Sequence, residues 1–300
     1  MNLQEEKLID DVLRASAEGP YCPWPRTAIA RVGSPEIATL KSRLRRIWSA
    51  GDYDRVSRYM EDGAESFYGR LALQPCSRLL DVASGSGQLT LIAARHGVDA
   101  TGVDLADNLV ERARERARVE GLRAHFKEAD AEALPFANAS FDAVTSFFGA
   151  MFAPRPKLVA GELLRVCRRG GMIAMANWTL QGFIGQLFKK VSKFIAPSGM
   201  PEPVLWGDEA TVRERFGAGI SRLELARRNF VFNFPFPPSE VVRFFRQYHG
   251  PTNRAFASLN RAERASLQTE MEELWSTYNL AKGGFTKVDA EWLEVIAVRA

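Results

Sequence analysis

Short apolar runs alternate with longer amphipathic stretches through the middle of the chain. Runs of this length are typical of buried strands, and they lie at 78–83, 99–104, 123–128, 141–147 and 171–177. The stretches between them carry apolar residues at helical spacing, which predicts helices at 87–95, 107–119 and 156–168. This alternation predicts an α/β fold in which helices cover both faces of a parallel sheet.

The N-terminal region has a helical pattern of its own. Apolar residues recur at helical spacing at Leu3, Leu8, Ile9, Val12 and Leu13, and residues 19–25 then break the pattern with glycine and proline. A second apolar stripe covers 37–48, before a turn at Gly51-Asp52. Residues 1–50 are therefore expected to form a helical extension.

Small residues crowd the end of the first predicted strand. The run Leu79-Leu80-Asp81-Val82 continues into Ala83, Ser84, Gly85, Ser86 and Gly87. Small side chains at every second position let backbone N–H groups and the next helix N-terminus approach a bound molecule. The next strand ends in Asp104, whose carboxylate can accept hydrogen bonds from a ribose diol. Together these features predict a nucleoside-binding edge.

The glycine spacing argues against a dinucleotide. A G-x-G-x-x-G fingerprint that starts at Gly85 needs a third glycine at position 90, where Thr90 stands. A pyrophosphate cradle is therefore poorly supported, and a nucleotide-dependent oxidoreductase is the less favoured alternative.

Five segments in order resemble the class I, Rossmann-like S-adenosylmethionine-dependent methyltransferases, in particular the branch that acts on small molecules in quinone biosynthesis. Asp81, Ala83, Gly85 and Gly87 fill the first motif, with alanine in the first glycine slot. Asp104 matches the ribose acid, 128–136 looks like the adenine-side motif, and 140–146 looks like the fourth strand. The turn 165–171 resembles the entry to the fifth strand, so the resemblance covers about residues 50–180.

The resemblance implies a doubly wound, mostly parallel sheet of seven strands in the order 3-2-1-4-5-7-6. Helices are expected at 183–195, 209–215, 239–248 and 261–279, and the last two strands at 223–233 and 292–299. We therefore expect a cofactor-binding domain at 51–234, a helical cap at 235–288 inserted over the active site, and a final core strand within 289–300.

The resemblance also implies S-adenosylmethionine as cofactor, with S-adenosylhomocysteine as product. Asp81 is expected to hold the amino-acid end, Asp104 the ribose and Asp130 the adenine amino group, although an acid at any of these positions can also serve only the local turn. The full expected cofactor-binding set is Asp81, Ala83, Ser84, Gly85, Gly87, Leu89, Asp104, Leu105, Asp130, Ala131, Ser146 and Phe147.

The expected acceptor pocket is largely apolar or aromatic, which favours a small hydrophobic acceptor. Its predicted lining is Phe148, Met151, Phe152, Asn177, Trp178, Phe183 and Tyr248. The alternative is that many of these side chains only pack the cap against the sheet. His249 and Tyr248 are the candidates for a general base, and no metal cluster is visible.

Residues 183–195 predict a basic amphipathic helix, with Lys189, Lys190 and Lys193 between apolar positions. A lid packed on the active site is favoured over a helix that rests on a membrane surface, because three lysines give only weak attraction to anionic lipid.

Composition adds few constraints. The formal net charge is +4, and the basic stripe Lys41, Arg43, Arg45 and Arg46 leaves a non-catalytic or RNA-associated role as an alternative. The fourth strand, however, ends in Ser146-Phe147-Phe148-Gly149 and lacks the Asn/Asp-Pro-Pro-aromatic motif of enzymes that methylate nucleic-acid amino groups. Three isolated cysteines and an N-terminus without a signal peptide or a membrane span suit a cytoplasmic protein. We expect no nucleic-acid partner and no stable membrane insertion, and the oligomeric state stays open.

Overall fold

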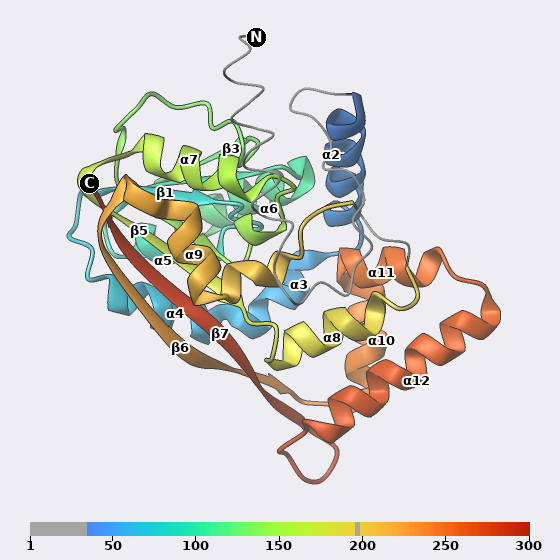
Figure 1. Ribbon diagram of the computed structural model, residues 1–300. Coiled ribbons are helices and arrows are strands. Elements are labelled where there is room, and N and C mark those ends of the chain that lie inside the picture. The colour runs from blue at the N-terminus through green and yellow to red at the C-terminus, as the bar shows by residue number, and fades with distance from the viewer. Residues whose placement is uncertain (1–34, 196–198) are drawn as a thin grey trace.

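The computed structural model describes residues 35–195 and 199–300, so the predicted helix at 3–13 lies outside the described residues. The described chain forms a seven-stranded sheet in the order β3-β2-β1-β4-β5-β7-β6, as Figure 1 shows. The strands are β1 (Arg78–Val82), β2 (Asp99–Asp104), β3 (Ala124–Glu128), β4 (Phe141–Phe147), β5 (Cys167–Trp178), β6 (Ile220–Phe234) and β7 (Thr286–Arg299). Pairing is parallel up to β5 and antiparallel for β5 with β7 and for β7 with β6. The predicted fold class and strand order are confirmed.

Helices follow the strands as the alternation predicts. They are α5 (Gln88–Arg95), α6 (Asp107–Glu120) and α7 (Pro156–Val166), whereas α4 (Glu61–Leu71) precedes β1 and was not expected. Figure 1 shows α4 and α5 on one face of the sheet and α7 on the other. The expected helix at 156–168 ends two residues early, because Cys167 already pairs with Phe141 as the first residue of β5.

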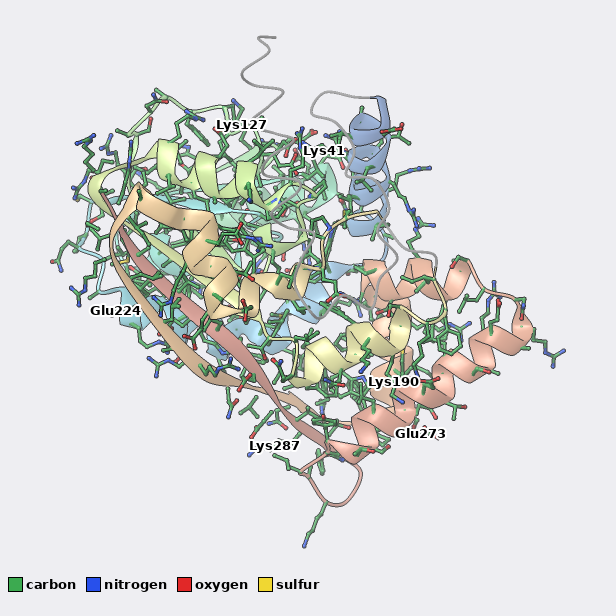
Figure 2. All side chains as sticks on the ribbon, in the orientation of Figure 1. Lys41, Lys127, Lys190, Glu224, Glu273 and Lys287 are labelled. Carbon is green, nitrogen blue, oxygen red and sulfur yellow. The ribbon has the colours of Figure 1, made fainter. Side chains whose placement is uncertain are left out.

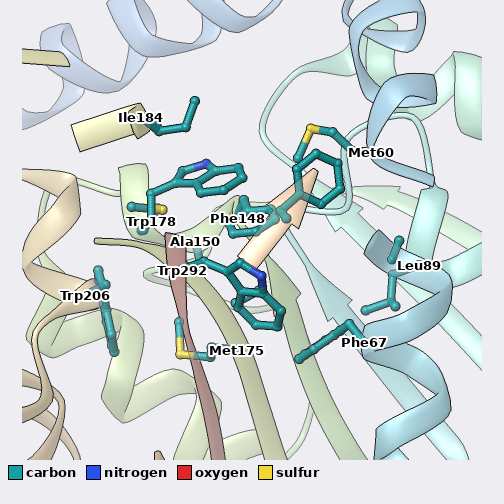
Figure 3. Packing of buried hydrophobic residues seen from close by; sticks show 14 of the residues in the cluster. Met60, Phe67, Leu89, Phe148, Ala150, Met175, Trp178, Ile184, Trp206 and Trp292 are labelled. Atoms are coloured by element: carbon teal, nitrogen blue, oxygen red, sulfur yellow. The ribbon is translucent and has the colours of Figure 1, made fainter. Parts of the chain in front are cut away.

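Aromatic side chains fill the core where β5 and β7 pass under the helices. Phe148 and Trp178 stack with ring centroids 3.7 Å apart, and Trp292 meets Phe148 edge to face at 5.7 Å, as Figure 3 shows. All three side chains are buried. Contacts of this kind add to the stability from apolar burial and hold the carboxyl end of β5 in place.

The segment between β6 and β7 holds three helices rather than the two expected. They are α10 (Pro238–Tyr248), α11 (Gly250–Ala257) and α12 (Arg261–Thr277). His249 leaves the helical region, at φ −85° and ψ 109°, and α11 then begins at Gly250 with Pro251 in its first turn. β7 begins at Thr286, six residues before the expected strand, because Thr286, Val288 and Ala290 already alternate as buried positions.

The remaining described elements lie outside this alternation. They are α2 (Pro35–Trp48), α3 (Tyr53–Ser57), η1 (Arg58–Met60), η2 (Ala150–Phe152), α8 (Phe183–Val191), η3 (Pro203–Gly207), α9 (Glu209–Phe216) and η4 (Gly217–Gly219). The predicted helix at 183–195 thus ends its regular part at Val191. Among the described residues, no helix combines the length and the apolar character that a membrane crossing requires.

Candidate active site

The turn from β1 into α5 forms the floor of the site. Ala83 and Gly85 both take φ +56°, a conformation that glycine adopts freely and that costs alanine energy. A Cβ on Gly85 would meet only the Tyr53 ring, at 3.6 Å. A side chain at Gly85 would therefore extend toward the Tyr53 ring.

Asp104 closes the end of β2 and is oriented by two backbone donors. Its Oδ2 accepts from the Gly85 N–H and its Oδ1 from the Ala106 N–H, both at 2.9 Å. Burial raises the pKa of this carboxyl, and the backbone hydrogen bonds partly offset the rise. The carboxylate is thus fixed beside the Gly85 turn.

Asp81, the last acid of β1, is also buried. Thr90 Oγ1 donates to it at 2.8 Å and Thr145 Oγ1 at 3.2 Å. Desolvation and, to a smaller extent, nearby Asp104 raise the pKa of Asp81 to about 7, and these hydrogen bonds offset part of the rise. Thr90 occupies the position at which a dinucleotide fingerprint has glycine, and its hydroxyl donates its hydrogen bond to Asp81.

A cavity lies over this edge of the sheet and collects most of the predicted cofactor residues. Ten of them line it: Asp81, Ala83, Ser84, Gly85, Leu89, Asp104, Leu105, Asp130, Ala131 and Phe147. Gly87 and Ser146 do not line it. A Cβ on Gly87 would lie 3.0 Å from the Phe126 ring, and Ser146 Oγ accepts from the Ala150 N–H, so both residues serve the packing of the turns.

Of the predicted acceptor residues, Phe148 and Phe152 line the cavity. Met151, Asn177, Trp178, Phe183 and Tyr248 do not. Phe183 packs on Trp275 and Tyr278, and Trp178 lies behind Phe148 in the stack. These residues form the core that supports the wall of the cavity.

The N-terminal elements supply a wall that the sequence analysis missed. Lys41, Leu44 and Trp48 of α2, Tyr53 and Ser57 of α3, and Met60 line the cavity. The apolar stripe at 37–48 indicates that one face of this helix is packed, but it does not indicate that this face lies over the cavity.

The candidate base His249 stands behind this wall. Its ring lies 6.0 Å from Trp48 and 6.1 Å from Tyr53, and its Nδ1 is 2.8 Å from Thr252 Oγ1. Burial lowers the pKa of His249 to about 4, so the imidazole is neutral at physiological pH. Tyr248 Oη, the other candidate, accepts from Arg55 at 3.3 Å. Neither residue lines the cavity.

Comparison with known proteins agrees with this geometry. A family model described as a methyltransferase domain matches residues 80–175, from β1 to β5. An uncharacterised protein of Mycobacterium tuberculosis is 36% identical over 239 residues, which cover 78% of this chain and 87% of that protein. Demethylmenaquinone methyltransferase of Thermus thermophilus is 40% identical over 134 residues, 42% of this chain and 60% of that enzyme.

The chain belongs to the class I S-adenosylmethionine-dependent methyltransferases. The structure of the YcgJ protein of Bacillus subtilis has the same fold, with a TM-score of 0.55 at 18% identity, over 79% of this chain and 98% of that chain. The protein is thus a methyltransferase that uses S-adenosylmethionine. No group of three or more His, Cys, Asp or Glu side chains within 35–195 and 199–300 could hold a metal ion.

Two buried polar atoms in the wall of the cavity fit such a cofactor. Ser84 Oγ and Gln88 Nε2 have no hydrogen-bond partner among the described residues, and both side chains line the cavity. Buried polar atoms are costly without a partner, so these two favour a polar ligand at this edge.

Proposed function

We propose that this methyltransferase transfers the methyl group to a small, hydrophobic and aromatic acceptor by in-line displacement. The observation that carries the proposal is the aromatic wall of the cavity, formed by Trp48, Tyr53, Phe147, Phe148 and Phe152. Aromatic faces give a flat apolar molecule a large contact area. The similarity to an enzyme named for demethylmenaquinone supports the same class of acceptor.

The cofactor would be held along the edge formed by β1, β2 and the loop after β3. Asp104 would accept from the ribose hydroxyls, Asp130 from the adenine amino group, and Asp81 would hold the amino-acid end. When bound, S-adenosylmethionine supplies a methyl group already activated by the sulfonium. The protein then has to align the acceptor and keep the reacting atoms dry.

The side chains that line the cavity offer little help in removing a proton from the acceptor, so the acceptor has to ionise easily by itself. The titratable side chains in the described lining are Lys41, Tyr53, Asp81, Asp104 and Asp130. Burial raises the pKa of Tyr53 to about 12, with Asp104 adding to the rise, so its hydroxyl is a donor rather than a base. An aromatic hydroxyl, which ionises far more easily than an aliphatic one, suits this wall best.

An RNA-associated role has weaker support. Lys41 pairs with Asp130 and Glu132, and Arg45 pairs with Glu128. Half of the basic stripe is therefore neutralised by this chain's own acids, which leaves less charge for phosphate contacts.

The cytoplasmic location stays a prediction.

Transfer of labelled methyl from S-adenosylmethionine tests the proposal. The panel contains a hydroxylated naphthalene, phosphatidylethanolamine vesicles and an RNA oligonucleotide, with Asp104→Ala as the control in which cofactor binding is weakened. We expect label on the hydroxylated aromatic alone, and a tenfold or larger rise in its KM in Trp48→Ala. Label found only on the phospholipid amine or on RNA would overturn the proposal.

A further inference from the structure

Lys41 joins α2 to the loop that follows β3. Its Nζ contacts Asp130 Oδ2 and lies 2.5 Å from Glu132 Oε2. The Glu132 side chain is fully buried and is also held by Arg155, whose Nη2 lies 2.7 Å from Oε2. Figure 2 labels Lys41 on the side of α2 that faces the rest of the molecule.

The same face of α2 forms a roof over the cavity. Lys41, Leu44 and Trp48 are spaced by three and four residues, which places them on one side of the helix, and all three line the cavity. The C-terminal end of α2 is fixed separately, because Gly51 bridges to His249 and a Cβ on Gly250 would lie 2.2 Å from the Ile47 carbonyl oxygen. Lys41 therefore fastens the part of the roof that lies beyond this anchored end.

Lys41 also orients Asp130. Asp130 Oδ1 accepts from the Glu132 N–H at 2.9 Å while Oδ2 contacts Lys41 Nζ, so both oxygens are held in place. Each carboxylate oxygen can accept more than one hydrogen bond, which leaves capacity for a ligand amino group.

We propose that Lys41 is a cofactor-positioning residue, which fastens α2 over the cofactor and aims Asp130 at the adenine amino group. This rests on the proposed cofactor placement. We expect α2 to lift when the cofactor leaves, which breaks the contacts of Lys41. Glu132 keeps Arg155 as a partner when this happens, so opening does not strand a buried carboxylate.

The test measures S-adenosylhomocysteine release by stopped-flow tryptophan fluorescence, which Trp48 in the roof makes sensitive to the ligand. Lys41→Met is expected to release the ligand at least tenfold faster, whereas Lys41→Arg restores most of the wild-type rate. Arg45→Met is the matched control, because Arg45 is on the same helix and its ion pair with Glu128 is largely exposed. Thermal melting identifies loss of fold, and Lys41→Gln replaces Lys41→Met if that variant melts early.

A second ligand separates positioning from simple support. S-inosylhomocysteine lacks the adenine amino group, so the wild type should bind S-adenosylhomocysteine more tightly. In Lys41→Met, the logarithm of the ratio of the two affinities should fall by at least half. Unchanged release and preference in a well-folded Lys41→Met, or equal effects in Arg45→Met, would overturn the proposal. If the wild type itself fails to bind S-adenosylhomocysteine, the cofactor placement fails instead.

Discussion

Asp104 is positioned before any ligand arrives, since the Gly85 and Ala106 N–H groups already fix both of its oxygens. Asp104→Ala removes the acceptor proposed for the ribose hydroxyls. A hydrogen bond to a charged group contributes about 1.5–3 kcal/mol, so affinity for S-adenosylhomocysteine should fall roughly ten- to a hundredfold in calorimetric titration. Asp107→Ala, an exposed acid in the first turn of α6, is the matched control. Unchanged affinity in Asp104→Ala would remove this residue from the site.

Asp81 gives the site a pH dependence. Its pKa in the free protein is raised to about 7, so the protonated form dominates in mildly acidic solution. The ammonium of the cofactor favours the ionised carboxylate, so binding at low pH must expel a proton. Affinity for S-adenosylhomocysteine should therefore rise with pH up to about 7 and then level off.

Calorimetry across this pH range, with Asp81→Asn as comparison, checks the dependence. The variant is expected to show weaker and flat affinity, because asparagine does not titrate. A wild-type profile that is flat below pH 7 would show that Asp81 does not face the ammonium.

Single residues differ in how well the sequence predicts them. The acids of the cofactor edge could be predicted because each lies at or close to the end of a strand within a short motif, and strand ends of a parallel sheet share one edge. Trp48 and Tyr53 could not, because they reach the cavity from helices that precede the motif. Trp178 and Phe183 were assigned to the acceptor pocket because the sequence does not distinguish an aromatic residue of the core from one that lines a ligand site.

The β1–α5 turn is the element on which cofactor binding depends most directly. Gly85→Val adds a branched side chain at φ +56° on the side that is open to the cavity. Gly121→Val is the matched control, since Gly121 has φ +66° at the end of α6 and a Cβ there meets nothing within 4 Å. Left-handed backbone costs a non-glycine residue roughly 1–2 kcal/mol, so both variants should melt earlier.

Only Gly85→Val should lose binding of S-adenosylhomocysteine in calorimetry. If Gly85→Val binds as well as Gly121→Val, the turn does not meet the ligand.

Helix α8 combines two roles. Phe183 is buried against Trp275, so Phe183→Ala should lower the free energy of unfolding by about 3–5 kcal/mol. Phe188 packs on Phe152 of the cavity wall at 5.9 Å, so Phe188→Ala should raise the acceptor KM more than it weakens cofactor binding. Thermal melts and steady-state kinetics separate the two effects. A raised acceptor KM without loss of stability in Phe183→Ala would contradict this division.

Lys190 of α8 and Lys193, two residues beyond its end, favour a lid over a membrane helix. Lys190 and Lys193 both pair with Glu270 of α12, at 3.2 and 3.0 Å, which reduces the charge available to anionic lipid. Negligible sedimentation with anionic vesicles at physiological salt stays our prediction.

Elements with a strong local pattern could be predicted well. The strands of the parallel sheet and the helices between them follow directly from periodicity. Helix α4 was missed because charged residues and two glycines dilute its apolar face, although Phe67 and Leu71 are buried. Helix α11 was missed because Pro251 reads as a helix end, whereas here it begins a helix.

At the scale of the whole molecule, the segment from α2 to α3 is joined to the segment between β6 and β7. The Asp52 N–H donates to the Tyr248 carbonyl at 2.9 Å, next to the bridge of Gly51 with His249. These segments are almost two hundred residues apart, and no local pattern in the sequence could reveal their contact. The division into 1–50, 51–234, 235–288 and 289–300 stays a prediction. The joint nevertheless links the roof of the cavity directly to the predicted cap.

A crystal structure of the chain with S-adenosylhomocysteine tests the site most directly. We expect the ligand in the cavity over β1 and β2, with its ribose hydroxyls on Asp104, its adenine amino group on Asp130 and α2 fastened through Lys41. Space for an acceptor should remain against Trp48 and Phe152. A ligand bound elsewhere, or one whose ribose lies away from Asp104, would contradict this placement.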